Sequence, residues 1–329
     1  MSRDPTTGAR PGAGAATRAD VDYRALRNGA AAIDLSAWTV LGLRGPDARS
    51  FLQSVTTQDL ERLAPGEALP ALVLSEKGRT LELVWIGFVD GTAAPGAATS
   101  PGGAVSFAYV LAEEAARGSL RAHFEHLRIM EDVEFAGPGG MPRLLGVAGP
   151  GRADLVSGIT SVILGAVALR GDPLSFALIP ADTPTISLPD LADAVAVEAW
   201  RLAVGLPRAG VDFDAERIAT ELALPRAISM TKGCYVGQEV VARTATRGRV
   251  RRQRIGFRFR WEGEPIPRGA ELRAGGNAAG HVTSSALEPG TGEGLGMGFL
   301  SGEALAAPVE VLAVVGTQTT HVHVLPWPL

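Results

Sequence analysis

The sequence is poor in several residue types, and each shortage excludes a class of protein. It holds one cysteine in 329 residues, which excludes an internal disulfide and a self-contained zinc–thiolate or iron–sulfur site. The apolar run at residues 155–169 has fifteen residues and two glycines, fewer residues than the roughly 20 that a membrane-spanning helix needs. We therefore expect a cytoplasmic protein without a membrane segment.

The length of the chain predicts more than one domain, because 329 residues are too many for one ordinary hydrophobic core. Hydrophobic residues make up 46% and charged residues 20%, which is typical of a globular protein. The first 20 residues are rich in Gly, Pro, Ala and Thr and predict a disordered tail without a signal peptide. After this tail we expect an α+β region at 21–245 and an all-β domain at 250–329.

Strand and helix patterns alternate along the α+β region. Strands are expected at 38–45, 80–90, 104–112, 128–135 and 143–149, and helices at 45–55, 113–127 and 189–205. Pro189 is expected to open the last helix and Gly205 to close it in the left-handed region. Glu198 shares a face of that helix with apolar residues, so it either pairs with Arg201 at the edge of the core or points into a pocket.

From residue 252 the pattern changes to a strict period of two, which predicts a strand. One side carries apolar residues and the other carries arginines: Ile255, Phe257, Phe259 and Trp261 against Arg252, Arg254, Arg258 and Arg260. Five further short strands, separated by Gly-, Pro- and Asn-rich turns, predict a small barrel or sandwich.

The basic residues are concentrated in one part of the chain. Residues 232–260 include nine basic residues and one acidic residue, although the whole chain has a net charge of −4. The arginine side of the strand is therefore either a solvated outer face or a site for an anion, such as folate glutamates, an acidic partner or RNA phosphates. Direct nucleic-acid binding is not expected, because no surface aromatic residues alternate with the arginines.

The one cysteine lies in the segment TKGCYVGQEVVAR, residues 231–243. A nearby positive charge or a helix N-terminus favours the reactive thiolate, and Lys232 is two residues from Cys234. Gly233 and Gly237 permit backbone angles that are closed to other residues. From these residues alone, Cys234 is either a half-buried structural cysteine or a reactive thiol.

This segment resembles the K-G-C-Y-x-G-Q-E signature of the YgfZ-type folate-binding proteins, a branch of the glycine cleavage T-protein (aminomethyltransferase) superfamily. Every position of the signature matches, and an arginine follows it: Lys232, Gly233, Cys234, Tyr235, Gly237, Gln238, Glu239 and Arg243. The resemblance extends over about residues 22–325. It implies two α/β subdomains and a small C-terminal β-barrel around a central channel that holds tetrahydrofolate.

The resemblance also implies a function. Proteins of this branch support the assembly or repair of iron–sulfur enzymes, including tRNA-methylthiolating ones. Cys234 is then the critical thiol, with Lys232 beside it as the second catalytic candidate. The other signature residues are expected to bind folate together with Glu198 and Glu82. The implied partners are folate, including its polyglutamylated forms, and iron–sulfur client or assembly proteins.

Two alternatives stay open from the sequence. The first is a tetrahydrofolate-dependent aminomethyl transferase or demethylase. Its relatives use an aspartate near the segment that residues 78–84 match, whereas this chain has Glu82 there. The strand pattern leaves open whether Glu82 faces the pocket or the solvent, where strand glutamates more often lie. The second alternative is a basic interaction module that docks an acidic protein or RNA. Metal binding is not expected, because the histidine pairs at 123/126 and 321/323 have no visible third ligand.

Overall fold

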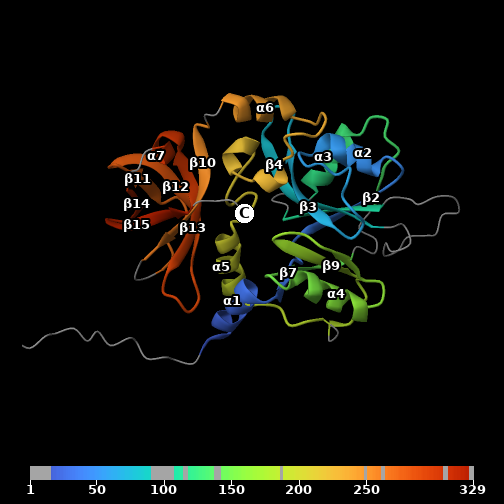
Figure 1. Ribbon diagram of the computed structural model, residues 1–329, viewed down its shortest axis with the longest axis horizontal. Helices are drawn as coiled ribbons and strands as arrows, with labels where there is room; N and C mark the ends of the chain where they lie inside the picture. Colours follow the sequence, from blue (N-terminus) through green and yellow to red (C-terminus); the bar gives the residue numbers. More distant parts are fainter. Residues whose placement is uncertain are drawn as a thin grey trace, which may run out of the picture.

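The structure is a computed structural model that describes residues 16–89, 107–113, 118–136, 142–185, 188–247, 250–260, 264–306 and 310–325. It contains a five-stranded sheet, a four-stranded sheet and a closed six-stranded barrel. Figure 1 shows the two sheets on one side of the molecule, the barrel on the other side and helix α5 (Ala194–Val204) between them. The mixed α and β fold with a C-terminal barrel, predicted from the sequence, is confirmed.

The first sheet is antiparallel, with the strand order β3-β4-β5-β2-β6. Its strands are β2 (Thr39–Arg44), β3 (Ala68–Leu74), β4 (Thr80–Val89), β5 (Phe107–Ala112) and β6 (Glu134–Ala136). Helices α2 (Ala48–Val55) and α3 (Ser119–Leu127) cover one face of the sheet. The rings of Phe51 on α2 and Phe124 on α3 meet edge to face with centroids 5.9 Å apart, which is a favoured aromatic geometry.

The second sheet has the strand order β1-β7-β9-β8 and packs against the first. Its strands are β1 (Ala31–Asp34), β7 (Arg143–Ala148), β8 (Val167–Leu169) and β9 (Leu174–Ile179). Helix α4 (Arg152–Val162) covers its outer face. The inner faces of both sheets share one core, in which Trp85 of β4 contacts Phe176 of β9 with ring centroids 5.8 Å apart.

The C-terminal barrel closes in the strand order β10-β13-β12-β11-β14-β15. Its elements are β10 (Arg252–Phe259), β11 (Glu271–Ala274), β12 (Asn277–Leu287), β13 (Gly294–Ser301), α7 (Gly302–Ala306), β14 (Val311–Val315) and β15 (Gln318–Leu325). Phe257 and Phe259 fill its interior and pair across the sheet with Gly296 and Gly294. A Cβ at either glycine would lie within 2.3 Å of the facing ring, so these glycines make room for the aromatic core. Trp261 lies outside the described residues.

Helix α5 and the shorter helices that follow it lead from the sheets to the barrel. Helix α5 (Ala194–Val204) packs on α1 (Arg18–Asn28), and its Leu202 joins a small apolar cluster with Ala286, Leu295 and Met297 of the barrel. Two short 3-10 helices (Ala219–Leu222 and Pro225–Ala227) and α6 (Gln238–Arg247) follow. Among the described residues, no helix is long and apolar enough to cross a membrane.

Several predicted boundaries are wrong. Helix α5 begins at Ala194 and not at Pro189, because the carboxylate of Asp193 accepts a hydrogen bond from Val195 N–H and caps the first turn. Helix α1 begins at Arg18, inside the predicted tail. Of the predicted strand at 128–135, only Glu134 and Phe135 belong to a strand, β6. Helix α3 begins at Ser119. Parts of three predictions lie outside the described residues: the start of the strand (104–106), the start of the helix (114–117) and most of the tail (1–15). The domain boundaries at 21–245 and 250–329 stay predictions.

Candidate functional site

A cavity of about 260 Å³ lies where the inner faces of the two sheets meet α5. Strands β1, β4 and β9 contribute to its wall, together with α5 and the loop at 206–209 that follows this helix. Gly205 ends α5 in the left-handed region (φ +66°), as the sequence predicts, and the turn directs the following residues into the cavity wall. The cavity thus lies between segments that are far apart in the sequence.

One side of the cavity is aromatic. Trp38, Trp85 and Trp200 line it, and the rings of Trp38 and Trp85 lie 5.4 Å apart. The Nε1–H donor of Trp85 is buried and has no hydrogen-bond partner within the described parts of the chain. A buried donor without a partner is costly. The tryptophan rings themselves suit this wall to a flat ligand.

The other side of the cavity carries carboxylates. Glu82 is 6% exposed and lines the cavity together with Glu113 and Glu198. Of the two orientations that the sequence left open for Glu82, the structure has the one toward the pocket. The register of β3 and β4 shifts between Val73, which pairs with Glu82, and Leu74. A period of two cannot be followed across such an irregularity.

Glu198 satisfies both alternatives that the sequence left open: it lines the cavity and it pairs with Arg201. Its two carboxylate oxygens accept hydrogen bonds from Nε and Nη2 of Arg201 at 2.8 and 2.6 Å. Arg208, on the loop after α5, donates to Glu113 at 2.5 and 2.8 Å and lies 3.9 Å from Glu198. Two arginines thus fix the orientation of two cavity carboxylates.

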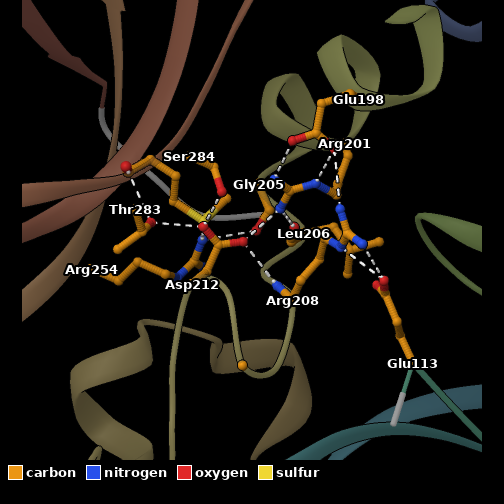
Figure 2. Close-up of polar contacts among 12 residues, drawn as sticks. Glu113, Glu198, Arg201, Gly205, Leu206, Arg208, Asp212, Arg254, Thr283 and Ser284 are labelled. Atoms are coloured by element: carbon orange, nitrogen blue, oxygen red, sulfur yellow. Dashed lines mark hydrogen bonds and ion pairs between the residues drawn. The ribbon is translucent and has the colours of Figure 1, made fainter. Parts of the chain in front are cut away.

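The same arginines connect the cavity to the barrel through Asp212 (Figure 2). The buried Asp212 carboxylate lies 2.7 Å from Nη1 of Arg201 and accepts hydrogen bonds from Ser284 and Thr283 of β12 at 2.6 and 2.7 Å. Burial by itself raises the pKa of Asp212, but the charge of Arg201 and these hydrogen bonds outweigh it and lower the pKa below its usual value. Burial lowers the pKa of Arg201, and its hydrogen bonds and charge interactions with Glu198 and Asp212 reverse that effect and raise it.

The cysteine segment lies elsewhere. Of the described residues that line this cavity, none belongs to 231–243. Cys234 is exposed. The Lys232 ammonium is buried and donates to the carbonyl oxygens of Gln53, Thr56 and Gln58 at 2.6 to 2.8 Å. Burial lowers the pKa of Lys232 to about 8, while the charges of Asp59 and Glu61 oppose this shift. These contacts anchor the segment to the end of α2.

The remaining signature residues divide between the core and the surface. Tyr235 is buried in the core that the two sheets share. Gly237 has a φ of +80° and lies directly before α6, so the predicted role of a permissive glycine is confirmed there. Gly233 has no positive φ, and its added Cβ would meet no atom within 4 Å. On α6, Glu239 pairs with Arg243, and both are exposed; Gln238 is the first residue of this helix.

The arginine side of strand β10 is not uniformly solvated, and that expectation is wrong at two positions. Arg254 is 2% exposed and donates to the carbonyl oxygens of Leu222 and Gly205 at 2.6 and 2.8 Å. Arg258 is partly buried and pairs with Glu288 at 2.8 Å. Arg252 and Arg260 are exposed. The strand therefore does not present the four free cations that a basic interaction module requires.

Sequence patterns alone missed most of the cavity wall. Trp38, Trp85, Glu113 and Arg208 line the cavity, and none of them belongs to a recognisable motif. Arg208 and Asp212 follow the predicted helix at 189–205, within the range 22–325 over which the sequence resembles the T-protein superfamily. The resemblance gave no role for their side chains.

Comparisons with known proteins agree with this architecture. Residues 252–329 match the glycine cleavage T-protein C-terminal barrel domain. The chain is 28% identical to an aminomethyltransferase of Rubrobacter xylanophilus over 86% of its length and 79% of the relative. It is 27% identical to the human mitochondrial iron–sulfur cluster assembly factor IBA57, over 89% of this chain and 84% of that protein. These similarities support membership of the T-protein superfamily.

A solved structure supports the same fold for most of the chain. The glycine cleavage system aminomethyltransferase T from Bartonella henselae superposes with a TM-score of 0.74, covering 94% of this chain and 89% of that one. The sequence identity is 18%, so this likeness concerns the fold. The superfamily includes proteins named as transferases and proteins named as iron–sulfur assembly factors, and the fold does not decide between these functions.

Proposed function

We propose that this chain is a cytoplasmic folate-binding accessory protein of the YgfZ-type branch, which supports the assembly or repair of iron–sulfur enzymes, including tRNA-methylthiolating ones. The observation that carries the folate part is the cavity beside α5, which combines a tryptophan wall with the buried carboxylate of Glu82 and the partly buried carboxylates of Glu113 and Glu198. The iron–sulfur part is supported by the similarity to human IBA57.

The residues of the cavity fit a reduced folate. Its pterin ring is flat and offers N–H donors and a carbonyl acceptor. Glu82 and Glu198 would accept from the donors, and Trp38 would pack against the ring. Folate, when bound, supplies a carrier for one-carbon units.

Cys234 would act at the surface and not on the folate. Its thiol is exposed on a segment that Lys232 and Gly237 hold in place. A single thiol cannot hold a cluster alone, so a cluster role for it requires ligands from a client protein or from a small-molecule thiol.

The iron–sulfur role can be tested in cells that lack the protein, by measuring the activity of an iron–sulfur enzyme such as a tRNA methylthiotransferase. We expect the wild-type chain to restore this activity and Cys234→Ala, present at the same level, to fail. Met230→Ala, which removes an exposed side chain four residues before Cys234, is the matched control and should restore it. Full rescue by Cys234→Ala would contradict the role of the thiol, and lack of rescue by the wild type would contradict the whole proposal.

A second candidate function is tetrahydrofolate-dependent aminomethyl transfer or demethylation. It is favoured by the burial of Glu82 in the cavity wall, where a carboxylate can position and deprotonate a substrate. This function requires turnover of a methylamine-type donor by the purified protein with tetrahydrofolate, whereas the accessory role requires binding without turnover.

A further inference from the structure

A separate polar cavity of about 240 Å³ lies between the loop at 210–217 and the barrel. Arg217 comes from the loop, Arg268 from the segment before β11 and His281 from β12. It shares no lining residue with the cavity beside α5, and a third cavity of about 280 Å³ contains residues of both.

The cationic side chains of this polar cavity are held in place. The guanidinium of Arg217 stacks over the ring of Phe299, with its Cζ 4.5 Å from the centroid. The His281 ring stacks against Phe299 as well, with centroids 5.9 Å apart and an interplanar angle of 27°. Arg268 donates from Nη2 to the carbonyl oxygen of Gly210 at 3.1 Å. The shared aromatic ring therefore brings a guanidinium and an imidazole to one wall.

Opposite charge is scarce in this cavity. Within the described chain, no carboxylate forms an ion pair with Arg217, Arg268 or the neighbouring Arg252. Two aspartates line the wall. Asp212 already binds Arg201 and the hydroxyl groups of β12, and Asp214 is exposed and accepts from a backbone N–H.

The electrostatic environment of His281 agrees with this imbalance. Partial burial lowers its pKa, the charges of Arg217, Arg252 and Arg268 lower it further, and Asp214 opposes them. Like charges that converge in a partly buried place repel one another, and a bound anion relieves this repulsion.

We propose that this cavity, lined by Arg217, Arg268 and His281, is a binding site for a small oxyanion, the carboxylate or phosphate group of a ligand. Guanidinium groups match both anions, because their parallel N–H donors can contact two oxygens at once. Two sources have this chemistry: a free phosphate-bearing ligand, and the glutamyl carboxylates of a folate tail that extends from the neighbouring cavities. A phosphate-binding role does not depend on the iron–sulfur role or on folate binding beside α5, whereas the folate-tail source rests on the proposed folate function.

The test is a titration of the full chain with inorganic phosphate and, separately, with a triglutamate peptide, at constant ionic strength set with sodium chloride. The chain has five histidines, so the ring proton resonances of His281 can be followed by NMR. We expect a saturable shift with at least one of the two anions, and a higher pKa of His281 in the bound form, because the anion stabilises the imidazolium. A response to phosphate alone assigns the first source, and a response to triglutamate assigns the second.

Variants make the test specific. Arg268→Gln should weaken binding at least about tenfold and should fold normally, because this side chain is exposed. Arg217→Gln is a second variant with the same expected loss. Arg273→Gln is the matched control, since Arg273 is an exposed arginine of the same barrel that pairs with Glu271 and lies outside the cavity; it should bind like the wild type. The proposal is overturned if neither anion gives a saturable shift, or if both cavity variants bind like the wild type.

Discussion

At the scale of single residues, Gly237 determines how the cysteine segment lies on the first sheet. Its φ is +80°, and a Cβ there would lie 2.8 Å from the carbonyl oxygen of Ser75 and 3.1 Å from Cα of Gly78. Both contacts belong to the turn between β3 and β4. A side chain would thus meet backbone that cannot move without disturbing the sheet.

We expect Gly237→Ala to lower the free energy of unfolding by about 1–3 kcal/mol, because the side chain adds both backbone strain and a clash. Gly233→Ala is the matched control four residues away, where an added Cβ meets no atom within 4 Å, and it should change stability by less than about 0.5 kcal/mol. Urea denaturation of both variants measures the difference. Equal effects of the two substitutions would contradict the close approach at Gly237.

Single-residue roles were only partly predictable from the sequence. The order of residues 231–243 identified a resemblance, and Gly237 has the backbone conformation that was expected of it. The pattern could not show that the Lys232 ammonium binds three backbone carbonyls of residues 53–58, because those groups are more than 170 positions away. Nor could it orient Glu82, which lies beside a register shift in its strand.

At the scale of elements, α5 joins the cavity to the barrel. Arg201, near its C-terminal end, contacts both Glu198 in the cavity wall and Asp212 on the following loop, and Asp212 in turn binds β12. Arg254 of β10 donates to Gly205, the residue that caps α5. Breaking a buried pair of this kind leaves the remaining charge without compensation, which costs more than the pair itself contributes.

Asp212→Asn should destabilise the protein by about 3 kcal/mol at pH 7, and this difference should shrink in acid. The native pKa of Asp212 lies below the ordinary value of 3.8, so the unfolded state takes up this proton first as the pH falls. The stability that the carboxylate contributes is therefore present above pH 3.8 and is lost as the pH falls through its native pKa.

Denaturant unfolding of wild type and Asp212→Asn at pH 7, 5, 4 and 3 measures this dependence. Asp214→Asn is the matched control, because Asp214 lies on the same loop but is exposed, and it should stay within about 0.5 kcal/mol of the wild type. A gap between wild type and Asp212→Asn that stays constant down to pH 3 would mean that the pair with Arg201 does not lower the pKa of Asp212.

Elements were predictable where one face meets the core and the other does not. The strict alternation in β10 predicted its buried Ile255, Phe257 and Phe259 correctly. The strands β3 and β9 are covered on both faces, and their sequences ALPALVL and LSFALI therefore lack the alternation that marks a strand. Arg254 is an exception to the alternation, because it is buried on the arginine side of the strand. Its partners, the carbonyl oxygens of Leu222 and Gly205, lie outside the barrel and could not be predicted from the strand itself.

At the scale of the whole molecule, two sheets and a barrel are arranged around α5 (Figure 1). The cavity lies where the inner faces of the two sheets meet this helix. The sequence alone could not assemble this wall, because residues between positions 33 and 209 contribute to it. The superfamily resemblance supplied the expectation of a central channel. The structure adds a separation that the resemblance did not imply: Cys234 is exposed, and no residue of its segment 231–243 is among the described residues that line the cavity.

This separation gives the central claim its most direct test, which is a calorimetric titration of the purified protein with tetrahydrofolate under anaerobic conditions. Wild type, Cys234→Ala and Glu82→Gln are compared, with Glu76→Gln as an exposed control from the turn before β4. We expect Cys234→Ala and Glu76→Gln to bind like the wild type. Glu82→Gln should bind at least about tenfold more weakly, because a hydrogen bond to a charged acceptor contributes about 1.5–3 kcal/mol. Unchanged binding by Glu82→Gln, or loss of binding in Cys234→Ala, would contradict the account.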